Sequence, residues 1–324
     1  CPARPSCQAS RRPSTPAPAI PMRATAQPFL EVSESNVQFG IGGAGTFSDG
    51  KLQSRSKDRR QAAVLAELVA AGAPEEIAYR QGAHLGTDRL RSIVARLQEA
   101  AVAAGAEIRY GAKAARLLGA DGRLHSLRLA DGTEIPADVC LLCPGHSARD
   151  TFFMLREIGV NLAAKPFAVG VRIEHGQAWL DRRQYKGYAG HPALGAADYR
   201  LTWQDPISGR GVYTFCMCPG GEVIAAASEP GGVVTNGMSY ADRSGPTANS
   251  ALVVTVGPAD FGGGDPLAGV RWQRALEQAA FREGGGDYRA PVQLLGDFLA
   301  GRAEPVEEPD PPPTYRPGVK FADL

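Results

Sequence analysis

The sequence lacks several features that would place it in a specialised class of protein. Its 324 residues contain no run approaching the roughly 18 apolar residues that a membrane-spanning helix needs. The 35 basic and 34 acidic residues nearly cancel, so charge gives no reason to propose nucleic acid or an acidic membrane as a partner. The six cysteines, at positions 1, 7, 140, 143, 216 and 218, are too sparse for a disulfide scaffold. We therefore expect a globular protein in a reducing compartment.

Acidic residues are also missing from residues 1–30, which carry four arginines and many Pro, Ser and Ala residues. This composition is typical of an organelle transit segment, and the alternative is a disordered leader outside the fold. A transit segment would direct the protein to the plastid (chloroplast) stroma; otherwise we expect it in the cytoplasm. Because the chain starts with Cys1 instead of methionine, we expect its true N-terminus to be missing or processed.

What the sequence does have is a glycine-rich stretch from Gly40 to Leu52. Such a loop can present several backbone N–H groups to one anion, most often a phosphate. Two standard motifs match the spacing of the glycines, but the residues around the stretch fit neither motif. The dinucleotide fingerprint needs a strand before it and a helix after it, and the P-loop needs Ser or Thr where Leu52 stands. We expect a phosphate or cofactor loop of neither standard kind.

Hydrophobic periodicity and turn signals predict the elements of the next hundred residues. Helices are expected at 58–71, at 88–104 with Thr87 as N-cap, and at 148–157 with Ser147 as N-cap. Short strands are expected at 107–110, 113–118, 123–129 and 133–135, as a β excursion. The apolar run 139–143 is typical of a strand buried in a parallel sheet.

From residue 166 onward, the sequence patterns indicate mainly β-strands. Strands are expected at 167–173, 211–218, 223–227 and 252–256, and one good helix at 269–282. Residues 301–324 are rich in proline and acid at their start and are expected to return toward the first domain.

Several longer motifs stand in an order that resembles a known family. They are Gly42–Leu52, His84–Asp88, Cys143–Asp150, Phe215–Gly221, Gly231–Ser239 and Pro313–Lys320. Together they closely resemble a family of FAD-dependent oxidoreductases (dehydrogenase-like proteins) of bacteria and plastid-bearing organisms. The resemblance covers roughly residues 34–324. The resemblance is to the middle of such a protein, without the N-terminal G-x-G-x-x-G unit and the C-terminal FAD-contacting segment.

The resemblance implies a fold and a set of cofactor contacts. The fold is α/β (α+β), with a partial FAD/NAD(P)-binding, Rossmann-like domain at 31–165 and a mainly β substrate or cap domain at 166–300. By analogy, the backbone of Gly42, Gly43 and Gly45 and the side chain of Ser48 approach the flavin or pyrophosphate. Ala114 offers its backbone to the adenine, and Gly145 lies near the ribose and pyrophosphate.

The chemistry of individual side chains suggests further candidates. Lys51 and Arg172 can balance phosphate or flavin charge, or can be solvated surface residues. His84 and His146 stand at loop-to-helix junctions and can act as acid or base, or serve only as capping residues.

Each of the two pairs of cysteines has more than one possible role. Cys216 and Cys218 share a strand face and can line the flavin as redox or substrate-facing thiols. Cys140 and Cys143 would point to opposite faces of a strand, which is poor geometry for zinc. Buried cysteines that behave as small apolar residues are the plainer alternative for them.

These observations predict an FAD-dependent oxidoreductase in fragment form, with an undefined small-molecule substrate. A cofactor-free binding or scaffold module, or an inactive partial product, is the alternative of a different class. A thiol or zinc protein is the third.

Overall fold

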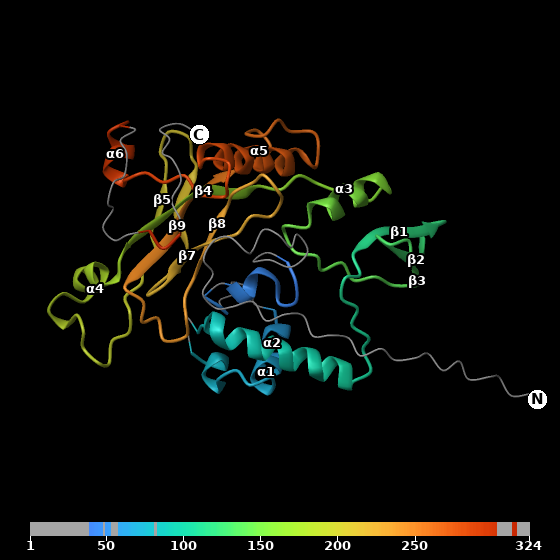
Figure 1. Cartoon of the computed structure of the whole chain (residues 1–324), viewed down its shortest axis with the longest axis horizontal. Coiled ribbons are helices and arrows are strands. Elements are labelled where there is room, and N and C mark those ends of the chain that lie inside the picture. The colour runs from blue at the N-terminus through green and yellow to red at the C-terminus, as the bar shows by residue number, and fades with distance from the viewer. Residues whose placement is uncertain (1–38, 48, 53–57, 81–82, 303–312, 316–324) are drawn as a thin grey trace, which may run out of the picture.

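The computed structural model describes residues 39–47, 49–52, 58–80, 83–302 and 313–315 (Figure 1). The expected leader, Ser48 and most of the segment 301–324 lie outside these residues. Helices and antiparallel sheets are mixed along the chain, so the expected α+β class is confirmed. No helix within the described ranges is long and apolar enough to cross a membrane.

The first part of the described chain is helical. Its elements are η2 (Gly43–Phe47), α1 (Arg60–Ala70), η3 (Glu75–Ala78) and α2 (Gly86–Ala103). The two α-helices confirm the helices expected here. Leu85 and Ile93 are fully buried between them, together with Ala71 and Ile77, because the apolar positions of both helices follow one face. This core holds α2 behind the glycine-rich loop.

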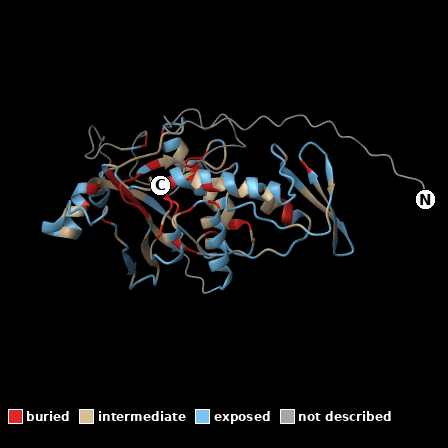
Figure 2. Cartoon of the chain, turned by 90° about the horizontal axis from the view of Figure 1, so that it is seen from below, coloured by how far each residue is buried: buried red, intermediate tan, exposed pale blue. Residues whose placement is uncertain are grey.

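A small antiparallel sheet follows, made of β1 (Ala114–Ala120), β2 (Arg123–Leu129) and β3 (Glu134–Pro136). Asp121 and Gly122 both have positive φ, which is what the tight turn from β1 to β2 requires. The sheet lies at one end of the molecule in both views and is largely exposed (Figures 1 and 2). The strand expected at 107–110 is absent, and those residues form an irregular segment.

A four-stranded antiparallel sheet dominates the second half, in the order β4-β9-β6-β5. Its strands are β4 (Phe167–Gly176), β5 (Thr202–Gln204), β6 (Gly211–Cys218) and β9 (Thr247–Val256). A two-stranded ribbon lies beside it, made of β7 (Glu222–Ala225) and β8 (Thr235–Met238). The helical elements here are α4 (Gln177–Tyr185), η4 (Lys186–Tyr188), α5 (Ala268–Glu283) and α6 (Leu295–Leu299).

Aromatic packing holds α5 against this sheet. The ring of Phe167 on β4 lies 5.5 Å from that of Phe261 and 6.0 Å from that of Trp272 on α5. A Cβ at Gly269 would stand 3.1 Å from the Phe167 ring, so the absence of a side chain lets the helix approach closely.

Buried charges join α3 (Arg149–Glu157) to α5. The guanidinium of Arg149 is buried and donates to Glu277, with Nη2 2.6 Å from Oε1, and to Glu229, with Nη1 2.5 Å from Oε2. Arg274 also binds Glu229, at 2.7 Å. Two guanidiniums thus face two carboxylates, and each buried charge has a partner.

Two local expectations for this part of the chain are wrong. Residues 139–143 form no strand, and Val139 and Leu141 are 79% and 87% exposed. An apolar run becomes a strand only where a neighbour supplies hydrogen bonds, and every strand pair in the described residues is antiparallel and lies elsewhere.

The expected N-caps are also wrong. Neither Leu85, the N-cap of α2, nor Ala148, the N-cap of α3, receives a side-chain capping bond. Thr87 lies inside the first turn of α2, where its hydroxyl donates to the Thr46 carbonyl. Ser147 offers its backbone carbonyl to the N–H of Arg149 instead.

Candidate functional site

The glycine-rich loop has a backbone that only glycine adopts easily. Gly40, Gly42 and Gly43 have φ of 96°, 84° and 54°. A Cβ at Gly42 would stand 2.3 Å from the Thr46 side chain, so the loop closes tightly over its own 3₁₀ turn. Among the described residues, the next α-helix after the loop is α1, which begins at Arg60, and this agrees with the view that the loop is not a dinucleotide fingerprint.

The end of this loop pairs with the segment before α2. Lys51 and His84 form an antiparallel bridge, and the Leu85 N–H donates to the Gly50 carbonyl at 3.0 Å. The backbone therefore brings Asp49, Lys51 and His84 to one place.

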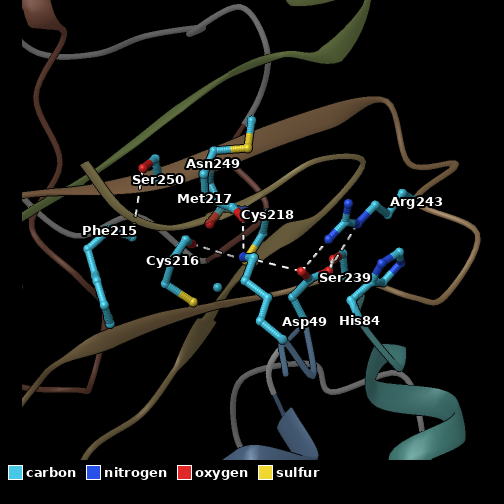
Figure 3. A network of polar contacts seen from close by, with 12 residues as sticks. Asp49, His84, Phe215, Cys216, Met217, Cys218, Ser239, Arg243, Asn249 and Ser250 are labelled. Carbon is cyan, nitrogen blue, oxygen red and sulfur yellow. Dashed lines mark hydrogen bonds and ion pairs between the residues drawn. The ribbon is translucent and has the colours of Figure 1, made fainter. Parts of the chain in front are cut away.

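Asp49 is the centre of a buried polar network (Figure 3). Its carboxylate is 1% exposed and lies 2.6 Å from Arg243 Nη2 and 3.2 Å from Lys51 Nζ, and it accepts a hydrogen bond from the Ser239 hydroxyl. Burial alone would raise the pKa of Asp49, but the Arg243 hydrogen bond and the charges of Lys51 and Arg243 outweigh it and lower that pKa. Asp49 is thus ionised and fixes both cations.

His84 lies beside this network. Its Nε2 is 3.0 Å from the carbonyl oxygen of Ala241. Burial, followed by the positive charge of Arg243, lowers the pKa of His84, so the ring is neutral near pH 7. A carbonyl oxygen only accepts, so Nε2 carries the hydrogen and Nδ1 keeps a lone pair.

The two cysteines of β6 sit at a β-bulge. The register with β9 shifts between Phe215 and Cys218, and Cys216 has a φ of 47°, which is strained for a residue with a side chain. Cys218 is 0% exposed, whereas Cys216 is half-buried. The bulge therefore gives the two thiols different access to solvent.

Lys51 reaches these thiols from the glycine-rich loop. Its Nζ donates to the Met217 carbonyl and lies 3.9 Å from Cys218 Sγ. Cys218 Sγ also donates to the Cys216 carbonyl at 3.3 Å.

The thiols have opposite acidities. The neighbouring Cys218 side chain favours the Cys216 thiolate and, together with the charges of Lys51 and Arg172, outweighs the opposing effect of burial and lowers the pKa of Cys216 to about 6. The interaction with Cys216 and burial raise the pKa of Cys218. At neutral pH the pair holds one thiolate, on Cys216, and one proton, on Cys218.

Behind the bulge lie two donors with no acceptor among the described residues. Arg172 Nη1 binds Asn249 Oδ1 at 2.5 Å and approaches the Cys216 carbonyl at 3.4 Å. Arg172 Nε and Asn249 Nδ2 remain without a partner. Unpaired buried donors are costly, so they mark a place that favours an acceptor or negative charge.

An open cavity of about 480 Å³ is lined by residues of β1, α3 and α5, with Glu229. Ala115, Arg116, Phe153 and Arg274 are among its lining residues, and the Arg274 guanidinium stands 5.5 Å from the centre of the Phe153 ring. Ala114 begins β1 next to this cavity. The two arginines are paired with the lining carboxylates of Glu157 and Glu229, and Asp150 adds a third carboxylate, so the flat Phe153 ring is the feature that suits an aromatic group here.

The structure gathers some of the residues singled out from the sequence. Lys51, His84, Cys216 and Cys218 lie around the Asp49 network, and Arg172 stands behind the bulge. His146 is exposed in the turn before α3, and Gly145 has open space around it with a φ of 77°. No described contact joins either residue to the network, and their roles stay predictions.

Sequence reasoning missed three members of the site. Asp49, Ser239 and Arg243 are joined by contacts that span more than 180 positions, with sequence separations of 190 and 194. The only local signal is Asp49 inside the glycine-rich loop, where an acid between glycines and a lysine suggests an ion pair.

The cysteines do not assemble a metal centre in the part of the chain that the structure describes. No group of three or more His, Cys, Asp or Glu residues with metal-binding geometry occurs there. Cys143 is exposed and Cys140 half-buried, so the expectation of a buried cysteine is wrong for Cys143.

Two comparisons with known proteins bear on this site. Residues 166–324 match the family described as "FAD-dependent protein, C-terminal domain-like". The chain is also 50% identical, over 291 residues, to an uncharacterized protein of Clostridium beijerinckii. The match covers 90% of this chain and 54% of that relative, so the chain spans about half the length of the relative. The match to the family supports an association with FAD.

Proposed function

We propose that this chain forms part of an FAD-dependent oxidoreductase, with the Lys51 and Cys216 region as the part that faces the flavin. The match of residues 166–324 to an FAD-dependent family carries the proposal. The matched region includes β6 with its thiols, together with Arg172 and Arg243. The substrate is proposed to be a small molecule.

The residues present fit such a cofactor in charge and in donors. The pyrimidine edge of a flavin bears carbonyl oxygens, and Arg172 Nε and Asn249 Nδ2 are donors in need of acceptors. Lys51 supplies positive charge beside them. Gly42, Gly43 and Gly45 are proposed to let the loop approach the cofactor closely, because they carry no Cβ atom.

The adenine end is proposed to lie at Ala114, beside the cavity lined by Phe153 and Arg274. FAD is an extended molecule, so its two ends can occupy separate parts of one protein. Gly145 would then lie along the connecting phosphates.

When bound, the flavin would supply the hydride or electron transfer, and the chain's own groups would supply charge and proton handling. His84 is neutral near pH 7 and can accept a proton at Nδ1. Lys51 is held by Asp49 and keeps a positive charge beside Cys216. The remaining partner of the reaction is undefined.

A spectral titration tests the proposal. FAD is added to the purified chain and the flavin absorbance and fluorescence are recorded. A saturable change in the flavin bands is expected. Spectra identical to those of free FAD throughout the titration would contradict FAD binding by this chain, and would favour the alternative of a cofactor-free binding module.

A further inference from the structure

The two thiols of β6 differ in the way that an attacking and a resolving cysteine differ. Cys216 is half-buried and can be reached from solvent, while Cys218 lies fully buried behind it. The Cys218 thiol donates to the carbonyl oxygen of Cys216 at 3.3 Å, so the two cysteines are in direct contact within the bulge. A lone reactive cysteine has no such partner.

We infer that Cys216 and Cys218 form a two-electron thiol–disulfide exchange pair that reduces anionic, low-molecular-weight disulfides. The Cys216 thiolate attacks one sulfur of the substrate, the substrate's S–S bond breaks, and the first thiolate leaves. Cys218 then attacks Cys216 Sγ of the mixed disulfide and gives its proton to the substrate thiolate that this attack displaces. The second substrate thiolate leaves, and the chain ends with a Cys216–Cys218 disulfide. The substrate has gained two electrons and the chain has lost them; an external dithiol returns the pair to its reduced form.

The bulge supplies the geometry for the second step. In a regular strand, alternate residues stand near the upper limit for a disulfide. The positive φ at Cys216 breaks that regularity, and Cys218 Sγ lies 3.3 Å from the Cys216 carbonyl oxygen. A bulge placed at a pair of cysteines is a local irregularity of the kind that re-aims side chains at sites of chemistry.

The positive charges near Cys216 explain why its thiolate attacks first and why the substrate is expected to be anionic. Lys51 and Arg172 both act on Cys216 and favour its thiolate, whose pKa is about 6. The same two cations would attract a disulfide that carries negative charge. Phe215, the neighbour of Cys216, is 63% exposed and offers an apolar surface next to the reacting sulfur.

This reaction needs only the chain's own thiols and does not rest on flavin binding. A failed FAD titration would leave it standing, and a failed exchange reaction would leave the FAD proposal standing. The two can therefore be judged separately.

The test uses the full chain with the other four cysteines, Cys1, Cys7, Cys140 and Cys143, changed to serine. The reduced protein is mixed without oxygen with the anionic aromatic disulfide 5,5′-dithiobis(2-nitrobenzoate), and the released thiolate is followed by stopped flow. We expect two released thiolates per chain and a final protein mass lower by two hydrogens. Cys218→Ser should release one thiolate and keep a covalent adduct on Cys216.

The rate of the Cys216 reaction and the charge of the disulfide substrate provide two further tests. A thiol of pKa about 6 is half ionised at pH 6, whereas an ordinary thiol is about 0.3% ionised, and the lower intrinsic nucleophilicity offsets part of this advantage. Cys216 should therefore react about tenfold faster at pH 6 than Cys143 in a chain that keeps Cys143 alone. An uncharged disulfide, 2-hydroxyethyl disulfide, should react more slowly than an anionic aliphatic one of similar size.

Two outcomes would overturn the inference. One is a single released thiolate with a stable adduct while Cys218 is present, in protein whose circular dichroism matches the Cys218→Ser variant. The other is a Cys216 rate at pH 6 no higher than that of Cys143.

Discussion

The ammonium nitrogen of Lys51 lies 3.9 Å from the sulfur of Cys218, although the two residues are 167 positions apart in the chain. The contact joins the end of the glycine-rich loop to the bulge in β6. It places a fixed cation beside two thiols, and Asp49 holds that cation from behind at 3.2 Å. Loop, ion pair and thiols therefore form one electrostatic unit, and each part can be tested by substitution.

Lys51→Met should raise the pKa of Cys216, because the lysine charge favours the thiolate. We expect the rate of Cys216 with an anionic disulfide at pH 6 to fall by about threefold to tenfold. The pH dependence of the stopped-flow rate measures the change. Lys165→Met, at an exposed position, is the matched control and should leave the profile in place. Equal pH profiles for the two variants would show that Lys51 does not lower the pKa of Cys216.

Asp49→Asn should destabilise the fold, because it leaves Arg243 and Lys51 without their buried counter-charge. Breaking a buried ion pair from one side costs about 3 kcal/mol. Urea denaturation at pH 7 measures the loss.

The effect of Asp49 should also depend on pH in a defined direction. The folded pKa of Asp49 is lowered, so its stabilisation is fully present above the unfolded value of about 3.9 and is lost as pH falls through the folded pKa. The difference between wild type and Asp49→Asn should be constant from about pH 5 to pH 8 and should shrink below about pH 4. A difference that grows on acidification would contradict the assignment.

His84→Gln should flatten the pH dependence of stability on the acid side of neutrality. The folded pKa of His84 is lowered, so below its unfolded pKa of about 6.5 the unfolded state binds a proton more readily, and wild type loses stability as pH falls from there toward the folded pKa. Denaturation midpoints at a series of pH values measure this slope. His191→Gln, at an exposed turn, serves as the control, and a slope unchanged by His84→Gln would rule out His84 as its source.

Arg149→Leu should destabilise the contact between α3 and α5, because it leaves the buried carboxylate of Glu277 without its guanidinium partner, while Glu229 keeps Arg274. A loss of about 3–5 kcal/mol is expected. Arg128→Gln, which breaks an exposed ion pair to Glu134, should change the denaturation midpoint little. Similar losses in both variants would mean that burial does not set the strength of the Arg149 network.

Local patterns predicted much of the fold. An apolar run predicted β6, and the Asp-Gly turns on either side predicted β2, both with correct boundaries; periodicity predicted α1, α2 and α5 within two residues. Helix α4 went unrecognised because its apolar residues do not line one face. The prediction of a strand at 139–143 is wrong because an apolar run contains no information about whether a neighbouring strand is there to pair with it.

The site was predicted in its residue types more than in its arrangement. Cys216, Cys218, Lys51 and His84 are recognisable because thiols, a lysine after glycines and histidines at loop ends are typical of chemistry. The bulge at Cys216 and the links from Asp49 to Ser239 and Arg243 depend on contacts between distant segments, which no local pattern contains.

The most direct test of the proposed flavin site is the visible spectrum of the FAD complex in wild type and Cys216→Ser. A thiolate against a flavin ring gives a broad charge-transfer band at longer wavelength than the flavin's own bands. The account predicts this band in wild type at pH 8, its loss on titration to below about pH 6, and its absence in Cys216→Ser. An FAD complex whose spectrum is the same in both proteins across this pH range would contradict the placement of the flavin at Cys216.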